Sequence, residues 1–336
     1  FLFTMSAARA DAKWFDFPLE SQVLAKIQRF RFTWKGGNPI STELDPANAM
    51  WLVRRETFDA YLIEQAKGRG ASVANEREVL MVEKTSSGWK VQVPGQSFAC
   101  RWLIVADGGR GQTAKKVGFA VRKFTLAGAI EAEIPAANPD PEVVLDFGRV
   151  HFGYAWSFPK PDGYSIGIGS YRGAEEGNLV KTLQEFCQDL KLNLSDGRWY
   201  GHPILLYNGE YPLHGDHALL SGEAACCVDP FTSEGIRWAL WTGLRAGEAV
   251  HKALQDDAAA PADYSRRVHT EFSQEMNCAA RLAGAFFKVP WLGYKVAAHR
   301  PGAVRTLMQL LSGERSYSQV TEKAMAQLNP LKWLGL

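Results

Sequence analysis

The chain has 336 residues, 46% of them hydrophobic and 22% charged, which is the balance of a globular protein with room for one large domain or two ordinary ones. The chain has 38 Lys and Arg residues and 36 Asp and Glu residues, so its net charge is only +2. This balance argues against a nucleic-acid-binding protein, which would carry a basic surface. No stretch approaches the roughly 18 consecutive apolar residues of a transmembrane helix.

The chain starts at Phe1, without the Met, basic region and long apolar run of a signal peptide, so we expect it to begin inside a longer protein. The first predicted element is a helix over 53–70, because Phe58, Leu62 and Ala66 recur at four-residue steps.

Strand signals follow this helix. Turn-forming residues separate short predicted strands at 72–74, 79–82 and 89–93. An apolar run at 102–106 is typical of a strand buried on both faces, and a helix is expected over 112–117.

Prolines punctuate a β-rich segment with strands expected at 127–134, 143–147, 154–158 and 164–170. The pattern ends with a helix over 178–190, a buried strand at 218–222, a helix over 236–254 and a mostly helical remainder after 258–261. This order predicts an α/β fold (α+β overall), in which an inserted β domain interrupts a sheet domain and helices follow.

The first motif with chemical content is LIVADGGR at 103–110, an apolar strand that runs into Asp107 and Gly108 before a helix. The carboxyl ends of parallel strands are where open α/β sheets bind ligands. Gly108 would let backbone approach a pyrophosphate, and Asp107 could hold a hydroxyl or a water. Taken alone, the motif is better interpreted as an ordinary strand-to-helix turn, because short motifs often match by chance.

The second motif follows the strand at 218–222. Gly222 and Glu223 open a Gly-acidic-Ala-Ala sequence, and ten residues later a helix begins around Ile236. An acidic side chain at a strand end can accept hydrogen bonds from sugar-alcohol hydroxyls. A helix amino terminus stabilises an anion, and a reduced flavin is one. A chance connection would not need so many special residues, so we interpret this motif as functional.

Together the two motifs resemble the second and third FAD-binding fingerprints of the glutathione-reductase-like flavoproteins, and within them the geranylgeranyl reductase family. The matching segments are VRRETFD at 53–59, ADG at 106–108, GYAWSFPK at 153–160, GHPI at 201–204, GEAA at 222–225 and PFTSEGI at 230–236. Several ordered motifs are more specific than any single one.

The resemblance implies an incomplete Rossmann-like FAD-binding domain, interrupted by an antiparallel β-sheet substrate domain and followed by a helical carboxyl-terminal region. We expect the FAD-binding domain at 45–118 and 212–256, the β-rich substrate domain at 1–44 and 119–211, and the helical region at 257–336. The family's amino-terminal G-x-G-x-x-G unit and its cysteine loop would lie upstream of Phe1, so no cysteine here inherits a role. The nearest internal match, at 167–173, is interpreted as a strand glycine pattern.

The resemblance also implies site residues. Those expected around FAD are Arg55, Asp107, Gly108, Gly222, Glu223, Pro230, Glu234, Gly235 and Ile236. Glu223 stands where the family usually has the shorter Asp. Tyr154, Trp156 and Phe158 alternate and so share one face of a strand, which by itself favours core packing. The resemblance instead assigns these three and Pro159 to the channel of a prenyl chain. No catalytic side chain is identified.

The expected function is reduction of C=C bonds in a prenyl (isoprenoid) chain by hydride transfer from reduced FAD, with NADPH or a ferredoxin as reductant, in lipid biosynthesis. One alternative is an FAD-dependent monooxygenase or halogenase of the same superfamily, although the halogenase W-x-W-x-I-P segment is missing. Another is a truncated, FAD-free fragment that binds a lipid or a partner. The visible spectrum and oxygen consumption would separate these.

Other features of the sequence give weaker indications of function. The five cysteines form no CxxC pair and His214 and His217 lack a ligand trio, so no metal site is expected. Free cysteines fit a reducing compartment, and we expect a cytoplasmic protein. Aromatic and cationic stretches at 286–288, 291–295 and 331–334 fit either a peripheral membrane contact or helices packed on the β domain. The prenyl substrate and the oligomeric state stay open.

Overall fold

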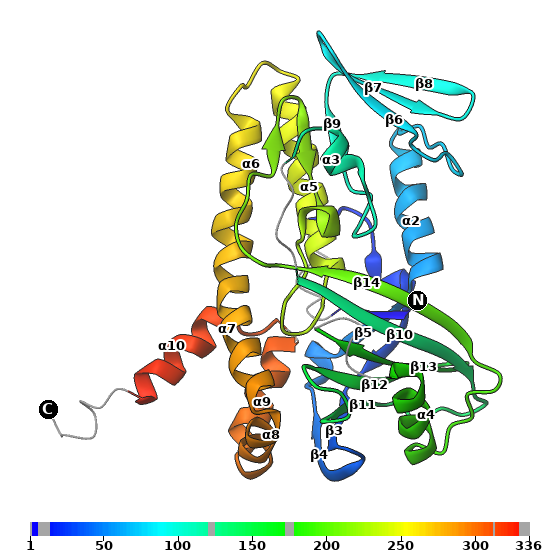
Figure 1. Ribbon diagram of the computed structural model, residues 1–336, viewed down its shortest axis with the longest axis vertical. Helices are drawn as coiled ribbons and strands as arrows, with labels where there is room; N and C mark the ends of the chain where they lie inside the picture. The colour runs from blue at the N-terminus through cyan, green and yellow to red at the C-terminus, as the bar shows by residue number, and fades with distance from the viewer. Residues whose placement is uncertain (1, 6–13, 120–124, 172–177, 312, 329–336) are drawn as a thin grey trace, which may run out of the picture.

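The structure, a computed structural model, describes residues 2–5, 14–119, 125–171, 178–311 and 313–328 (Figure 1). Its largest element is a seven-stranded sheet. In spatial order the strands are β14 (Arg198–Leu206), β10 (Thr125–Pro135), β13 (Gly163–Ser170), β12 (Gly153–Lys160), β11 (Glu142–Phe147), β3 (Arg29–Trp34) and β4 (Gly37–Glu43). All neighbours are antiparallel except β11 and β3, which run parallel.

One face of this sheet is covered by α4 (Leu179–Asp189). The helix is amphipathic, and its buried residues Leu183 and Phe186 pack against Ile166 and Ile168 of β13. Asn178 begins the helix with its side-chain oxygen on the Lys181 N–H, at 3.1 Å. Because residues on a strand alternate between faces, the other face of the sheet is left for a different lining.

The remaining described strands form three smaller sheets. The first joins β15 (His214–Gly215), β16 (Ala218–Leu220) and β9 (Leu103–Val105), with β16 and β9 parallel. The second consists of β1 (Leu2–Met5), β5 (Met50–Arg54) and β2 (Val23–Ile27), and α2 (Arg55–Gly68) follows β5 directly. The third is a meander of β6 (Met81–Thr85), β7 (Gly88–Val93) and β8 (Gln96–Cys100).

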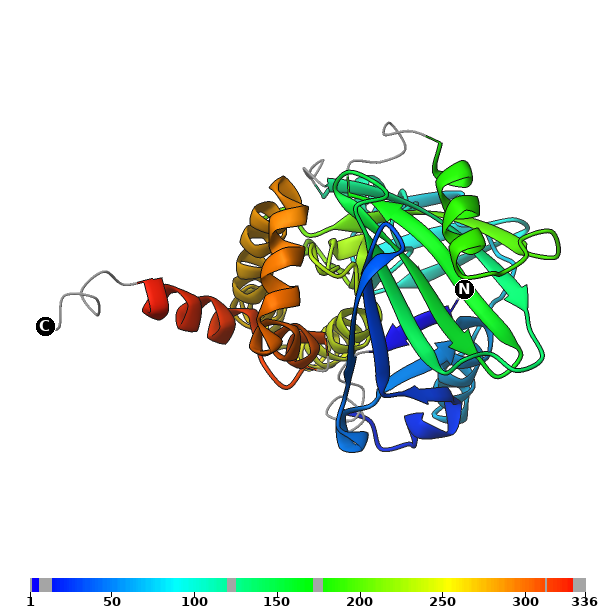
Figure 2. The same cartoon turned by 90° about the horizontal axis from the view of Figure 1, so that it is seen from below.

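Helices form the other side of the molecule (Figure 2). They are α5 (Ile236–Ala253), α6 (Ala260–Val268), α7 (Gln274–Lys288), α8 (Pro290–His299), α9 (Pro301–Leu311) and α10 (Tyr317–Leu328), with a π-helical segment (His269–Ser273) between α6 and α7. In Figure 1, α6 and α7 form one column beside α5, and α8 and α9 lie at its lower end. None of the described helices is long and apolar enough to cross a membrane.

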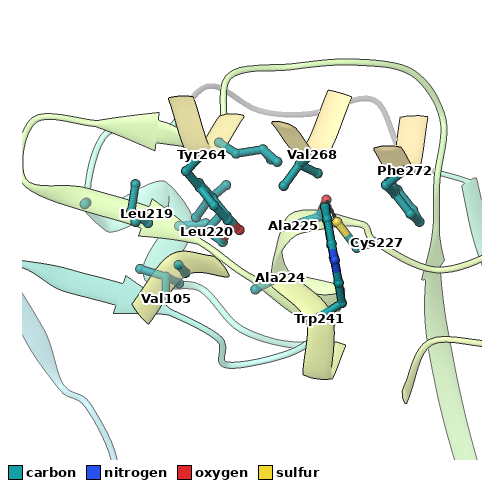
Figure 3. Packing of buried hydrophobic residues seen from close by; sticks show 14 of the residues in the cluster. Val105, Leu219, Leu220, Ala224, Ala225, Cys227, Trp241, Tyr264, Val268 and Phe272 are labelled. Atoms are coloured by element: carbon teal, nitrogen blue, oxygen red, sulfur yellow. Dashed lines mark hydrogen bonds between the residues drawn. The ribbon is translucent and has the colours of Figure 1, made fainter. Parts of the chain in front are cut away.

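The core between the parallel strands and the helices is shown in Figure 3. Leu219 and Leu220 of β16 are fully buried beneath Tyr264 and Val268 of α6, in a cluster that also contains Phe272. The hydroxyl of Tyr264, on α6, donates to the Leu220 carbonyl oxygen at 2.6 Å. This contact fixes the helical column to the strand that leads into the second motif.

The predicted α/β (α+β) fold class is confirmed, and so are the helices near 53–70, 178–190 and 236–254 and the four strands of the β-rich segment. Two predictions are wrong. Residues 71–75 have no regular structure, and Ile104 of β9 is 37% exposed, because β9 is the edge strand of its sheet. Strand β14 was not predicted; its Pro203 is accommodated because β14 is also an edge strand.

Replacement of Leu183 by Ala should lower the free energy of unfolding by about 2–5 kcal/mol, because it removes a fully buried side chain from the contact of α4 with the sheet. Val180→Ala is the matched control, since Val180 is 44% exposed on the same helix and its replacement should cost within about 0.5 kcal/mol. Urea denaturation measures both. Equal losses would contradict the packing described for α4.

Candidate functional site

The two motifs predicted from the sequence meet in the structure. Glu223 lies in a 3₁₀ turn, η5 (Gly222–Ala225), directly after β16, and its carboxylate reaches the glycine turn that follows β9. Gly108 has a left-handed φ of +74°. A Cβ placed on Gly109 would lie 2.5 Å from Glu223 Oε1, closer than any real contact. A side chain at position 109 would therefore displace the Glu223 carboxylate from this close approach.

Glu223 also joins this turn to the edge of the large sheet. Its Oε1 accepts the N–H of Leu205, on β14, at 2.9 Å, and its Oε2 is 3.7 Å from Nε2 of His202. Burial alone would raise the pKa of Glu223, but its contact with His202 and the amides of Leu205 and Gly109 hold the pKa below its ordinary value. The carboxylate is stabilised in its ionised form.

Asp107 and Gly222 have structural partners of their own. Asp107 Oδ2 accepts the N–H of Thr113, the first residue of α3 (Thr113–Lys116), at 3.0 Å. Gly222 has a φ of +62° and donates its N–H to Thr242 Oγ1, on α5, at 2.9 Å. Both residues thus hold a strand-to-helix turn in shape, whether or not they also contact a ligand.

The loop before α5 is organised by the buried carboxylate of Asp229. Its Oδ1 accepts the N–H groups of Phe231 and Thr232 at 2.7 and 3.1 Å, and its Oδ2 accepts the hydroxyl of Tyr317 at 2.6 Å. Burial raises the pKa of Asp229, and these three donors oppose that effect. The backbone then turns sharply at Ser233, whose φ is +61°.

The end of this loop begins the helix. Glu234 Oε1 accepts the N–H of Arg237, in the first turn of α5, at 2.8 Å. The predicted residue Glu234 therefore caps the helix whose amino terminus the motif offers to an anion. Gly235 lies against Val228, which a Cβ would approach to 3.1 Å. Ile236 is buried, as is Pro230 at the other end of the loop.

Two tyrosines, one on β12 and one directly after β13, also bind this loop. The Tyr154 hydroxyl, on β12, donates to the carbonyl oxygen of Thr232 at 2.9 Å, and the Tyr171 hydroxyl donates to that of Phe231. Burial raises the pKa of Tyr154 to about 12, so its hydroxyl keeps its proton at neutral pH. The second motif and the strand predicted to line the channel are therefore in direct contact.

A cavity of about 200 Å³ lies between the free face of the sheet and helices α7 to α9. The predicted channel residues Tyr154, Trp156 and Phe158 all line it, whereas Pro159 lies on the opposite face of β12. At one side it is bounded by His202 and by residues 231–234 of the loop before α5. Nearly all the remaining lining residues are apolar, including Phe286, Phe287 and Leu307.

The glycines of β13 make room for the aromatic wall. Gly167 pairs directly with Trp156 across β12 and β13, and a Cβ on Gly167 would lie 2.3 Å from the indole ring. Gly169, the next residue on the same face, leaves 3.5 Å to the same ring. The G-x-G at 167–169 is therefore a strand pattern, as predicted, that lets Trp156 lie across the neighbouring strand.

Arg55 lies apart from this group. It begins α2 and forms a two-pronged ion pair with Asp59, one turn later, at 2.7–3.0 Å. It does not line the cavity among the residues the structure describes. Within the same residues no group of three or more His, Cys, Asp or Glu side chains could hold a metal ion.

Sequence reasoning missed Tyr171 and Tyr317, the two further hydroxyls that shape the loop. Tyr171 lies 60 residues from its partner Phe231, and Tyr317 lies 88 residues from Asp229. No local pattern encodes contacts at such separations. His202 was noted only as part of a motif, although alternation along β14 places it on the cavity face with Tyr200 and Ile204.

Comparisons with known proteins agree with this geometry. The FAD binding domain family matches residues 22–176. Digeranylgeranylglycerophospholipid reductase 1 of Methanopyrus kandleri is 27% identical over 319 residues, covering 88% of this chain and 81% of the relative. A geranylgeranyl bacteriochlorophyll reductase-like protein from Thermoplasma acidophilum has a similar fold, with a TM-score of 0.73 at 19% identity over 92% of this chain and 80% of its own. The flavin-dependent brominase Bmp2 gives a TM-score of 0.65 at 19% identity over 92% and 84%.

Glu223→Gln should destabilise the protein by about 1 kcal/mol at pH 7, and this difference should vanish in acid. A carboxylate with a lowered pKa stabilises the folded state above its unfolded pKa, about 4.3 for glutamate, and loses that contribution as the pH falls through the folded pKa. Thermal unfolding from pH 7 to pH 3 measures the difference. Glu64→Gln, on the exposed side of α2, is the control. A gap that persists unchanged at about pH 3 would refute this account of Glu223.

Proposed function

We propose that this chain, which is similar in sequence and fold to the geranylgeranyl reductase-like FAD-dependent oxidoreductases, reduces C=C bonds of a prenyl chain. The resemblance predicted from its motifs is confirmed. One observation carries the finer proposal. An aromatic-walled cavity shares the loop at 231–234 with the motif that resembles an FAD fingerprint. A flavin held by this loop would face an apolar space suited to an isoprenoid.

The residues present fit a flavin cofactor. The turn at Gly108 is open, because a Cβ there would have only Glu223 Oε2 within 4 Å, at 3.9 Å. A phosphate or ribityl group could approach this backbone closely. Gly108, Glu223 and the loop before α5 are the segments we expect to hold FAD. When bound and reduced by NADPH or a ferredoxin, it would supply the hydride.

The chain's own residues would position the alkene and exclude water. Tyr154 and Trp156 form a tilted ring pair with centroids 5.9 Å apart, and Phe147 lies 5.9 Å from Tyr154 on the neighbouring strand. Phe286, on α7, meets Phe147 edge to face at 5.4 Å. Such a wall gives a flexible prenyl chain a large apolar contact and leaves little room for solvent.

The proposal is tested on the purified protein. Its visible spectrum should show bound FAD, and under anaerobic conditions the reduced protein should add hydrogen to a digeranylgeranyl lipid, followed by mass spectrometry. A protein that binds no FAD when supplied with the cofactor would overturn the flavoenzyme assignment. Bound FAD with NADPH-dependent oxygen consumption, and no reduced alkene, would instead support the monooxygenase or halogenase alternative, which the fold of the brominase also permits.

Trp156→Ala should lower kcat/KM for a prenyl substrate about tenfold or more while FAD remains bound, because the indole is a large part of the apolar wall. Ser157→Ala is the matched control: Ser157 is buried on the same strand but faces away from the cavity. Steady-state kinetics and the flavin spectrum measure the two effects. Equal kinetics for both variants would remove Trp156 from the substrate site.

A further inference from the structure

The helical hairpin below the cavity has an unusual charge pattern. Residues 276–313 contain no Asp or Glu but five Lys or Arg, in a chain whose net charge is only +2. This span covers most of α7 and all of α8 and α9. The five cations are Arg281, Lys288, Lys295, Arg300 and Arg305. The positive charges of this span are therefore not offset by carboxylates of the same span, which favours an anionic partner.

Exposed apolar side chains gather at the same place. Four of the eleven large hydrophobic residues that are exposed in the described part of the chain lie on α8 or directly before it. They are Val289 (56% exposed), Trp291 (40%), Leu292 (59%) and Val296 (44%). Scattered single hydrophobics need no explanation, but a cluster of this kind marks a contact surface. We call these four residues with Lys288, Lys295 and Arg300 the α8 face.

Contacts on the inner side of α8 fix its orientation. Tyr294 is buried, and its hydroxyl lies 2.6 Å from the carbonyl oxygen of Asn38 and 3.0 Å from that of Phe32. Trp291 stacks on Tyr294 at an interplanar angle of 7°, and the Lys295 ammonium lies 4.8 Å from the Trp291 ring centre. The exposed residues are thus held outward by packing.

The α8 face lies directly behind the cavity. Tyr294 of α8 and Val304 and Leu307 of α9 line the cavity from within. Figures 1 and 2 place α8 and α9 beside the β3–β4 hairpin at one end of the molecule. Of the stretches noted in the sequence, Phe286 and Phe287 face the cavity instead of solvent, and 331–334 lies outside the described residues.

We propose that the α8 face docks on the surface of an anionic lipid bilayer and brings the cavity to the membrane. The arrangement of charged and apolar residues on the α8 face favours a lipid surface as its partner. Apolar residues flanked by exposed cations, with no carboxylate in the span, match the acyl boundary and headgroups of anionic lipid. A second copy of the chain would set these cations against one another. The proposal deepens the proposed function by naming the source of the prenyl substrate, but docking itself requires neither FAD nor turnover.

The test is flotation of the full chain with vesicles that contain no prenyl lipid, of phosphatidylcholine alone or with phosphatidylglycerol. The wild type should bind the anionic vesicles, and less as salt rises. Val289→Ser with Leu292→Ser, and separately Lys288→Gln with Lys295→Gln, should each lower the partition coefficient about tenfold. Leu80→Ser with Met81→Ser is the matched control, since these residues are 54% and 47% exposed on the β6 side.

Equal binding of the wild type, the α8 variants and the control would overturn the proposal. Light scattering on the same samples detects the competing occupant: a dimer that dissociates in the Val289 and Leu292 variant, without vesicle binding, would assign the face to a second copy. Vesicle binding without prenyl reduction would leave docking intact and refute only the proposed function. Circular dichroism verifies that each variant is folded.

Discussion

The arrangement of the site depends on one buried carboxylate. Asp229 is buried, and burial of a carboxylate is costly unless it is hydrogen-bonded; two backbone amides and the Tyr317 hydroxyl donate to it. These bonds give the loop before α5 a single shape. The loop then presents two carbonyl oxygens outward, which the hydroxyls of Tyr154 and Tyr171 bind. These two hydrogen bonds join the second motif to the large sheet, together with the packing of Val228 against Ala127 and Leu206.

This junction changes how Tyr154 is understood. Alternation along the strand favoured a core residue and the family resemblance a channel residue; in the structure Tyr154 combines both properties, because its ring and its hydroxyl have different surroundings. The ring lines the cavity, while the hydroxyl donates a hydrogen bond to the carbonyl oxygen of Thr232. A side chain so fixed at both ends loses little further freedom when a ligand binds. Trp156, seated over Gly167, is fixed in the same sense by a neighbour that lacks a side chain.

Features set by local sequence could be predicted, whereas features set by contacts between distant residues could not. Helices α2 and α4 follow from the helical spacing of their apolar residues, and strands β10 to β13 from apolar runs separated by prolines and turns. The alternation on β12 correctly placed three aromatic rings on one face. Exposure of Ile104 could not be predicted, since it depends on which strands flank β9. Neither could the contacts of Tyr171 and Tyr317, which depend on tertiary packing across 60 and 88 residues.

Glu223 connects two parts of the structure. Its carboxylate contacts Leu205 and His202 on β14, and its Oε2 lies 3.9 Å from a Cβ position on Gly108 in the glycine turn. One oxygen is committed to the Leu205 amide. The other faces His202 and the open turn, so a cofactor hydroxyl arriving there would meet an ionised acceptor that is already oriented. Glu223 therefore links β14, the edge strand of the large sheet, to the glycine turn proposed to hold the cofactor. A shift of β14 would move the Glu223 carboxylate relative to that turn.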